Sequence, residues 1–256
     1  MSDSIKFLCR FFTDNVGDAN CSPIQFLDFQ PHAVERVEFS DFRKNYKAGK
    51  TDELLDQTVI VGGGFYDVKQ LKYLSQARKI VFWGGGIRDI SKYRSFLTKK
   101  AKALPNAKKT LYGVRDVGFG DQWVPCVSCI SDNFDKKYDI TSEYVVFQHH
   151  RQNIDLPFPK MINDQAEFSE AVGFLGSAEK VITNSYHGAY WATLLGKEVF
   201  IYNEINDKIS MLKWKPTFCE KDEWKGNTNA VTYPNALGEA REANLKFHEM
   251  VMNFIQ

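Results

Sequence analysis

Two stretches of the sequence decide the fold: residues 58–67 read TVIVGGGFYD, and residues 79–89 read KIVFWGGGIRD. In each stretch apolar residues run directly into three glycines, which is typical of a strand buried on both faces of a parallel sheet. Between the stretches, apolar residues recur at helical spacing at Val68, Leu71 and Leu74. The two stretches therefore predict a β-α-β unit.

The paired glycine runs also bear on function, because ligands of open α/β sheets bind outside the carboxyl ends of the strands. Glycine lets a backbone approach a ligand closely, although it is also an ordinary way to make a β-α turn. Neither run has the GxGxxG spacing with an acidic residue about twenty positions later, and neither ends in Gly-Lys-Ser/Thr. Nicotinamide dinucleotides and Walker-type ATP binding are therefore disfavoured.

The composition is that of an ordinary globular protein, with 43% hydrophobic and 25% charged residues. Lys and Arg number 33 against 32 Asp and Glu, and this net charge of +1 gives nucleic acids no general attraction. No apolar run approaches the roughly 18 residues that span a bilayer, and the start MSDSIKFLCRFF lacks the features of a signal peptide. We therefore expect a cytoplasmic protein that does not bind nucleic acid.

The five cysteines are an odd number scattered over the chain, which fits reduced thiols better than a disulfide framework. Cys126 and Cys129 form a CxxC in PCVSCI, a spacing found in zinc and redox sites. A structural zinc site usually needs a second pair of ligands, and the adjacent His149 and His150 are badly spaced for one. We therefore expect no bound metal.

The chain reads as two successive series of strands and helices, separated by the turn-rich residues 125–139. We expect an α/β fold with parallel sheets in an N-terminal Rossmann-like domain at 1–138, a C-terminal one at 139–235 and a closing helix at 236–256. The expected strands are 5–12, 58–61, 80–83, 110–114, 144–147, 180–183 and 198–202, and the expected later helices are 165–177, 189–195 and 236–255. The basic residues of 93–104 suit a solvated helix face or a patch facing anionic lipid.

Three places combine a strand end with residues that can do chemistry. Residues 13–18, TDNVGD, follow the first strand and offer Asn15 and Asp18, although such a sequence is also a common turn. Arg115 ends a strand, where it can bind an anion or pair with its neighbours. His187 follows a strand and precedes a helix of small residues, whose first amides can help to hold an anion. A structural role for that histidine is the competing interpretation.

Together these residues resemble the polysaccharide pyruvyl transferases, and the resemblance covers most of the chain. It rests on the order and spacing of several short motifs rather than on one of them. They are Asn15, Gly17 and Asp18; Gly62 to Gly64; Gly84 to Gly86; Val114 to Asp116; His187 and Gly188; and Gly196, Lys197, Val199, Tyr202 and Lys208. Many members have Arg-Leu-His-Gly where this chain has Ser185, Tyr186, His187 and Gly188.

The resemblance implies a GT-B-like pair of Rossmann-like domains facing a cleft, with the acceptor on the N-terminal side and the donor on the C-terminal side. It implies transfer of the pyruvyl group of phosphoenolpyruvate, as a ketal, to a sugar of a capsular polysaccharide, an exopolysaccharide or a lipid-linked precursor. No organic cofactor is required, and peripheral association with a membrane is compatible with a lipid-linked acceptor.

The expected site residues fall into three groups. For proton transfer we expect His187 and Asp18. The carboxylate and phosphate of the donor need cations and backbone amides. The donor group is Arg115, Ser185, Tyr186, Gly188, Lys208 and Arg88. The acceptor group is Asn15, Gly17, Gly63, Gly64, Gly85, Gly86, His149 and His150.

Two other functions fit the same sequence features. A GT-B glycosyltransferase that uses a nucleotide sugar shares the architecture, since a fold does not fix a function. A sugar-binding or anion-binding protein without activity is the other, because Ser185 stands where many members of the family have arginine.

Overall fold

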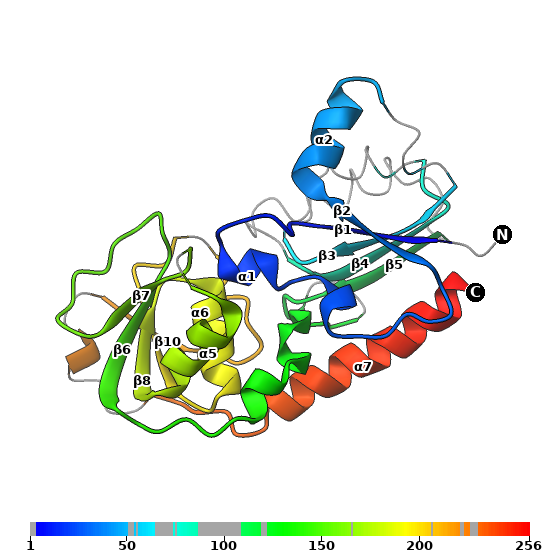
Figure 1. The fold of residues 1–256 in the computed structure, drawn as a ribbon. Coiled ribbons are helices and arrows are strands. Elements are labelled where there is room, and N and C mark those ends of the chain that lie inside the picture. Colours follow the sequence, from blue (N-terminus) through cyan, green and yellow to red (C-terminus); the bar gives the residue numbers. More distant parts are fainter. Residues whose placement is uncertain are drawn as a thin grey trace. The chain divides into compact units, whose positions relative to one another are not determined.

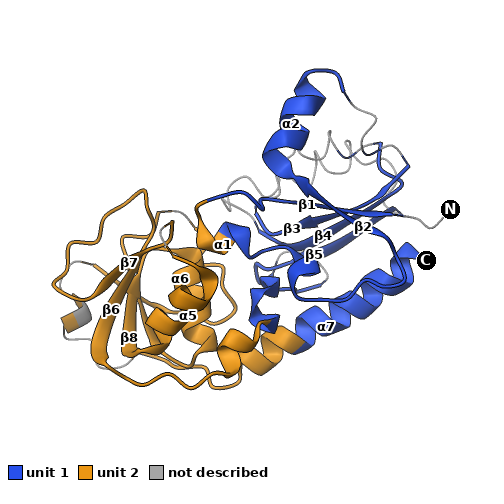
Figure 2. Cartoon of the chain, in the orientation of Figure 1, with its two compact units in different colours: residues 1–13, 18–130, 242–256 blue, residues 14–17, 131–241 orange. Residues whose placement is uncertain are grey.

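The chain forms two units, each built on a five-stranded parallel sheet (Figure 1). The computed structural model describes residues 4–50, 54, 56–64, 74, 76–86, 109–118, 122–164, 166–205, 207–220, 223–225 and 230–256. Unit 1 consists of residues 1–13, 18–130 and 242–256, and unit 2 of residues 14–17 and 131–241 (Figure 2).

The sheet of unit 1 has the strand order β2-β1-β3-β4-β5. Its strands are β1 (Ile5–Cys9), β2 (Val34–Glu38), β3 (Thr58–Gly62), β4 (Lys79–Gly85) and β5 (Thr110–Val114), and all neighbours are parallel. Gly84 has a φ of +63°, and the pairing of β4 with β5 shifts register between Phe82 and Gly85. The glycine run of β4 therefore bends the end of a central strand.

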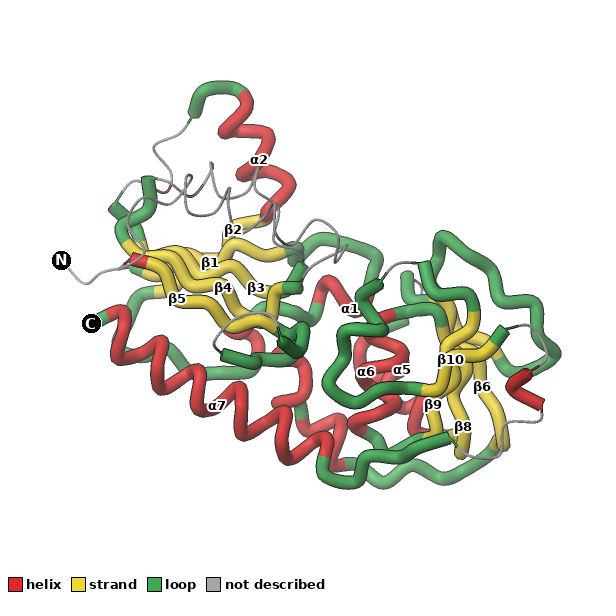
Figure 3. The backbone as a smooth tube through the Cα atoms, turned by 180° about the vertical axis from the view of Figure 1, so that it is seen from behind, coloured by secondary structure: helices red, strands yellow, loops and turns green. Residues whose placement is uncertain are grey.

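Both faces of this sheet are buried, because its residues alternate between two cores. Leu8, Val59 and Phe82 point to one face, together with Phe42 of α2 (Phe39–Lys47). Phe7, Ile60 and Trp83 point to the other face, where Phe247, Val251 and Ile255 of α7 (Ala236–Ile255) pack. In Figures 1 and 3, α2 and α7 accordingly lie on opposite sides of the sheet. The prediction that β3 and β4 are buried on both faces of the sheet is confirmed.

One buried amide joins α7 to the sheet of unit 1. Asn244 is fully buried, and its Oδ1 accepts a hydrogen bond of 2.8 Å from Nε1 of Trp83. Its Nδ2 lies 3.3 Å from the carbonyl oxygen of Pro125 and 3.4 Å from Sγ of Cys129. Asn244 thus satisfies polar groups of β4 and of the segment before the helix at 127–130.

The sheet of unit 2 has the strand order β10-β9-β8-β6-β7. Its strands are β6 (Ser142–Gln148), β7 (Lys160–Ile162), β8 (Ala178–Thr183), β9 (Glu198–Tyr202) and β10 (Thr217–Cys219). The helices α5 (Phe168–Gly176) and α6 (Tyr186–Leu194) pack against β8, while Ile154, Ile182 and Phe200 share a core cluster. Among the residues that the structure describes, the other short helices are α1 (Val16–Ala19) and the 3-10 turns η1 (Pro23–Gln25), η5 (Val127–Ile130), η6 (Asp132–Asp135) and η7 (Glu223–Lys225).

The two parallel sheets confirm the predicted α/β class and the two Rossmann-like units. The first strand ends at Cys9 and not at residue 12, because the N–H groups of Phe11 and Phe12 donate to the Glu38 carboxylate at 2.7 and 2.9 Å. The sequence predicted neither the edge strands β2, β7 and β10 nor the helix α2.

The units divide between residues 130 and 131, where the sequence suggested a boundary after 138, and residues 242–256 belong to unit 1. Most of the helix predicted after the first glycine run lies outside the described residues, as do Arg88 and residues 93–104. Among the helices that the structure describes, none is long and apolar enough to cross a bilayer.

Candidate active site

The polar residues of unit 2 gather where β6, β7 and β8 end. Two buried asparagines hold the loops there: Oδ1 of Asn184 accepts from the N–H of His149 at 2.7 Å, and Oδ1 of Asn163 accepts from the N–H of His150 at 2.9 Å. Nδ2 of Asn184 also donates to the carbonyl oxygen of Gln152 at 3.0 Å. These amides replace the sheet hydrogen bonds that end with the strands, so the loop after β6 has a defined course.

His149 and His150 therefore stand at this edge of the sheet, as predicted from their place after a strand. Their rings stack with centroids 4.3 Å apart. Nδ1 of His149 lies 3.2 Å from the N–H of Arg151 and accepts from it, while Nε2 of His150 accepts from Nε of Arg151 at 3.3 Å. His150 is exposed and His149 half-buried, so the pair presents imidazole to solvent on unit 2.

The turn from β8 into α6 carries the histidine that the sequence singled out. Ser185 is the N-cap of α6, with extended backbone, and its Oγ accepts from the N–H of Gly188 at 3.5 Å. Its own N–H donates to Oγ1 of Thr183 at 3.0 Å. The first turn of α6 places Tyr186 and His187 at the positive end of the helix, where backbone N–H groups attract anions.

His187 is held on two sides by aromatic rings. Its imidazole centroid lies 5.1 Å from the ring of Tyr186, in an edge-on arrangement, and 5.1 Å from the ring of Trp191. The side chain is 7% exposed. The orientation of the imidazole is therefore set by packing within α6.

The segment of residues 14–17 lies against this histidine in unit 2. A Cβ placed on Gly17 would come within 1.9 Å of Nδ1 of His187, so a side chain at position 17 would displace the imidazole. The N–H of Val16 donates to the carbonyl oxygen of Asn163 at 2.8 Å, and the N–H of Gly17 donates to Oδ1 of Asn15 at 3.1 Å. The structure thus brings Asn15 and Gly17 to His187, which is far from them in the sequence.

Asp18 and Arg115 belong to unit 1. Oδ2 of Asp18 pairs with Nη1 of Arg10 at 3.0 Å on a partly exposed surface. Arg115 and Asp116 are both buried, and Nε of the arginine lies 3.7 Å from Oδ1 of the aspartate. A guanidinium has five N–H donors in a planar fork, the geometry that suits a carboxylate.

The glycines of unit 1 approach the protein itself. A Cβ on Gly63 would lie 2.4 Å from Cβ of Cys21, one on Gly86 would lie 2.3 Å from Nε of Arg115, and one on Gly84 would lie 3.0 Å from the carbonyl oxygen of Pro125. Gly85 is buried, whereas Gly64 has open space around its Cα and a φ of +72°. At Gly63, Gly84 and Gly86 the close packing of the protein explains why glycine is needed, without a ligand. Of the four glycines with a measured Cβ environment here, Gly64 is the one with room for a ligand beside it.

Lys208 lies in the turn after β9, and a carboxylate shapes that turn. Oε1 of Glu204 accepts from the N–H groups of Ile209 and Ser210 at 3.0 and 3.1 Å. Burial raises the pKa of Glu204, while these two hydrogen bonds oppose the shift. Glu204 therefore holds the backbone of the turn that carries Lys208.

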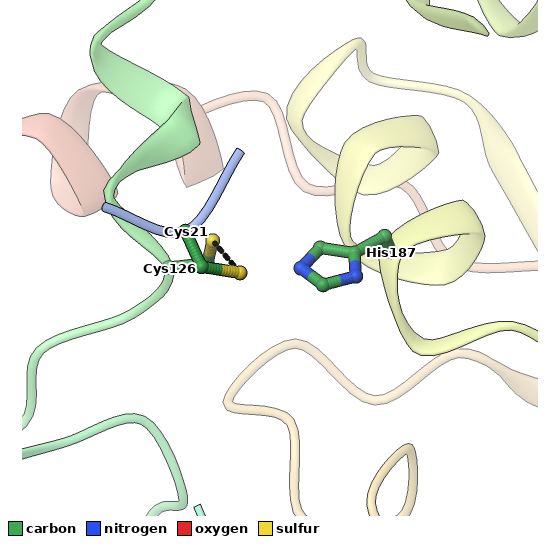
Figure 4. A group of neighbouring side chains, drawn as sticks. All are labelled: Cys21, Cys126 and His187. Carbon is green, nitrogen blue, oxygen red and sulfur yellow. Dashed lines mark hydrogen bonds between the residues drawn. The ribbon is translucent and has the colours of Figure 1, made fainter. Parts of the chain in front are cut away.

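All five cysteines are buried, and none of them forms a disulfide. Sγ of Cys21 and Sγ of Cys126 are hydrogen-bonded at 3.6 Å, as the dashed line in Figure 4 shows, and the figure also draws His187 on α6. The hydrogen bond to Cys126, together with burial, raises the pKa of Cys21. Burial raises the pKa of Cys9 to about 12, against hydrogen bonds from Ser22 and Gly62.

These thiols are expected to react slowly in the folded protein. At pH 9 a thiol with a pKa of about 12 is almost entirely protonated, and the thiolate is the nucleophile. Iodoacetamide at pH 9 should therefore modify Cys9 at least roughly 100-fold more slowly in the folded chain than in urea, as followed by peptide mass spectrometry. Equal rates in both conditions would contradict the burial of β1.

Comparison with known proteins supports the fold. The sequence matches no protein-family profile and no curated protein sequence. The structure is similar to the UDP-GlcNAc 2-epimerase of Methanocaldococcus jannaschii solved with UDP-GlcNAc and UDP, with a TM-score of 0.50, 11% identity, and coverage of 98% of this chain and 99% of that one. An uncharacterised protein of Klebsiella pneumoniae matches with a TM-score of 0.46 and 15% identity over 86% of this chain and 93% of that one. The epimerase has a GT-B-like fold, so the predicted GT-B-like architecture is confirmed.

Sequence reasoning missed three residues that organise the candidate site: Asn163, Asn184 and Glu204. Asn184 directly follows a predicted strand and directly precedes Ser185, and that position was an available signal. Asn163 and Glu204 act on segments that the sequence does not link to them, so their roles appear only in the structure.

Proposed function

We propose that this chain is a transferase that moves the pyruvyl group of phosphoenolpyruvate onto two hydroxyl groups of a sugar, forming a ketal. The observation that supports the proposal most is the contact of Gly17 with His187 inside unit 2. These residues belong to two motifs that resemble the pyruvyl transferases and lie far apart in the sequence, Asn-x-Gly at 15–17 and Ser-Tyr-His-Gly at 185–188. Both reach one place beside the positive end of α6, which suits an anionic donor.

The reaction needs a proton donor, a proton acceptor and an anion site. A proton adds to the methylene carbon of phosphoenolpyruvate, one sugar hydroxyl adds to C2, and the C2–phosphate bond breaks. The second hydroxyl then adds to C2, and its proton leaves with the released phosphate. We assign protonation of the methylene carbon or contact with the phosphate to His187, and acceptance of a hydroxyl proton to Asp18.

The other residues of the proposal bind and orient the substrates. The amides around Ser185, Tyr186 and Gly188 and the cation of Lys208, all in unit 2, would hold the carboxylate and phosphate of the donor. The acceptor sugar would lie near Asn15 and the imidazoles of His149 and His150 in unit 2. It would belong to a capsular polysaccharide, an exopolysaccharide or a lipid-linked precursor.

Replacement of His187 tests this function directly. His187→Ala and Asp18→Ala should each lower phosphate release from phosphoenolpyruvate by at least roughly 100-fold in the presence of an accepted glycan, because each would remove a proton-transfer group. Mass spectrometry of the glycan should show the added pyruvyl group after incubation with the unmodified protein, and not after incubation with either variant. His32→Ala is the matched control, since His32 lies in the loop before β2 in unit 1. Near-normal rates in folded His187→Ala would exclude the assigned role.

The likeness to a UDP-GlcNAc 2-epimerase supplies the second candidate, an enzyme acting on a nucleotide sugar. Thermal denaturation separates the two candidates. Phosphoenolpyruvate should raise the melting temperature while UDP-GlcNAc and UDP should not, because only a ligand that binds the native state stabilises it. Stabilisation by UDP-GlcNAc with none by phosphoenolpyruvate would favour the second candidate. Binding of phosphoenolpyruvate without phosphate release across a broad glycan panel would favour a non-catalytic anion-binding protein.

A further inference from the structure

The helix α2 and the loop of residues 10–12 form one surface of unit 1, joined by a single carboxylate. Oε2 of Glu38 accepts from the N–H groups of Phe11 and Phe12 at 2.7 and 2.9 Å. Oε1 of the same residue caps α2 by accepting from the N–H and the hydroxyl of Ser40 at 3.3 and 3.2 Å. Glu38 is buried, so these four hydrogen bonds satisfy its charge inside the protein.

The outer side of this surface is positively charged. Arg43, Lys44, Lys47 and Lys50 are all exposed, and within the described part of the chain no hydrogen bond or ion pair engages their charged groups. Asp41 is the exposed acid of the helix, so the stretch of residues 41–50 has a net charge of +3. Phe42 fills the opposite side of α2 and packs in the core. The cations are therefore directed away from the sheet.

An apolar side chain accompanies these charges. Phe12 is 84% exposed, the most exposed large hydrophobic side chain among the residues described. Its backbone is fixed next to the first turn of α2 by the hydrogen bond to Glu38. The neighbouring Arg36 places its guanidinium 5.5 Å from the ring centroid of Phe11. Such a ring costs free energy in water, and it gains when it inserts among lipid head groups and acyl chains.

We propose that α2 and Phe12 bind the surface of an anionic lipid bilayer. The unpaired cations supply attraction to acidic head groups, and Phe12 supplies an apolar anchor; a lasting peripheral contact needs two such signals. A nucleic acid fits less well, because the cations are confined to residues 43–50 beside an exposed phenyl ring and the whole chain carries only +1. Phe12 and the cations of residues 43–50 have no assigned role in the proposed reaction, so binding here does not depend on it.

Co-sedimentation of the full chain with vesicles tests the proposal. The protein should sediment with vesicles of phosphatidylcholine mixed with phosphatidylglycerol, and remain in solution with phosphatidylcholine alone. Each cation near an acidic surface strengthens binding about fivefold, so Arg43→Gln, Lys44→Gln, Lys47→Gln and Lys50→Gln combined should weaken it at least roughly 50-fold. Phe12→Ser should weaken binding in a way that added salt does not reproduce, since the apolar contact is not screened.

A second quadruple variant has the same net charge and serves as the control. It replaces four exposed lysines outside α2, namely Lys136→Gln, Lys137→Gln, Lys160→Gln and Lys246→Gln, and it should bind vesicles like the unmodified chain. Equal losses in both quadruple variants, or equal binding to both vesicle types, would overturn the proposal. Binding of single-stranded RNA by the full chain, without binding to either kind of vesicle, would also overturn the proposal. The vesicle assay contains no substrate, so a negative result would contradict membrane binding and would not bear on the proposed transferase activity.

Discussion

Gly188→Ala is expected to destabilise unit 2 by about 3 kcal/mol, because the added methyl group has no space. An ideal Cβ at position 188 would lie 2.4 Å from Oγ1 of Thr183 and 2.7 Å from Cδ1 of Phe147. Both neighbours are fully buried, and the hydroxyl of Thr183 already donates to the carbonyl oxygen of Phe147. Neither can move without breaking a core contact. The melting temperature should fall by roughly 6–12 °C in calorimetry.

The control for this substitution is another helical glycine. Gly238 lies in α7, and nothing comes within 4 Å of a Cβ placed on it. Gly238→Ala should therefore raise stability by roughly 0.5–1 kcal/mol, since alanine loses less backbone entropy in a helix. A Gly188→Ala protein that melts like Gly238→Ala would show that α6 does not pack against β6 and β8 as described.

Asn244→Ala is expected to destabilise unit 1 by about 2–3 kcal/mol. The substitution removes the acceptor of Nε1 of Trp83 and the donor to the carbonyl oxygen of Pro125. Trp83 is 1% exposed, so water does not replace the lost partner in the folded state. A buried polar group left without a partner costs more than the hydrogen bond itself contributed. Urea unfolding followed by tryptophan fluorescence should show an earlier transition.

A double-mutant cycle separates the hydrogen bond from the loss of packing. Trp83→Phe removes the indole N–H and keeps an aromatic ring, so Asn244→Ala should cost about 1 kcal/mol less in that background. Leu245→Ala, on the same helix and 49% exposed, should change stability by about 0.5 kcal/mol at most. Additive effects of Trp83→Phe and Asn244→Ala would mean that the two side chains do not interact.

The central strands could be predicted from the sequence because each carries its own signal. The apolar runs before Gly62 and Gly84 and the strand at Glu198–Tyr202 need no tertiary partner to be recognised. The edge strands differ: β2 reads VERVE with only its last two residues buried, and β7 and β10 have three residues each. Short or half-exposed strands form because a neighbouring strand offers hydrogen bonds, and a sequence pattern does not contain that information.

The candidate site was predicted in part for a similar reason. The position of His187 at a strand-to-helix turn is a local property, and the capping of α6 by Ser185 follows from it. The glycine runs are local as well, but what lies against Gly63 and Gly86 is Cys21 and Arg115. Which segment fills the space beside a glycine depends on the path of the whole chain. The same holds for Asn163, which anchors residues from two distant segments.

The division of unit 1 into three stretches has a consequence for how the protein is made. The apolar side chains of Phe247, Val251 and Ile255 complete one of its two cores, yet they are synthesised only after residues 131–241 of unit 2. At a synthesis rate of roughly 5–20 residues per second, the strands of unit 1 lack the packing of α7 for as long as unit 2 is being translated. The nascent sheet of unit 1 therefore has an uncovered apolar face for several seconds, which makes it a natural client for chaperones, and loss of the last turns of α7 would prolong that exposure indefinitely.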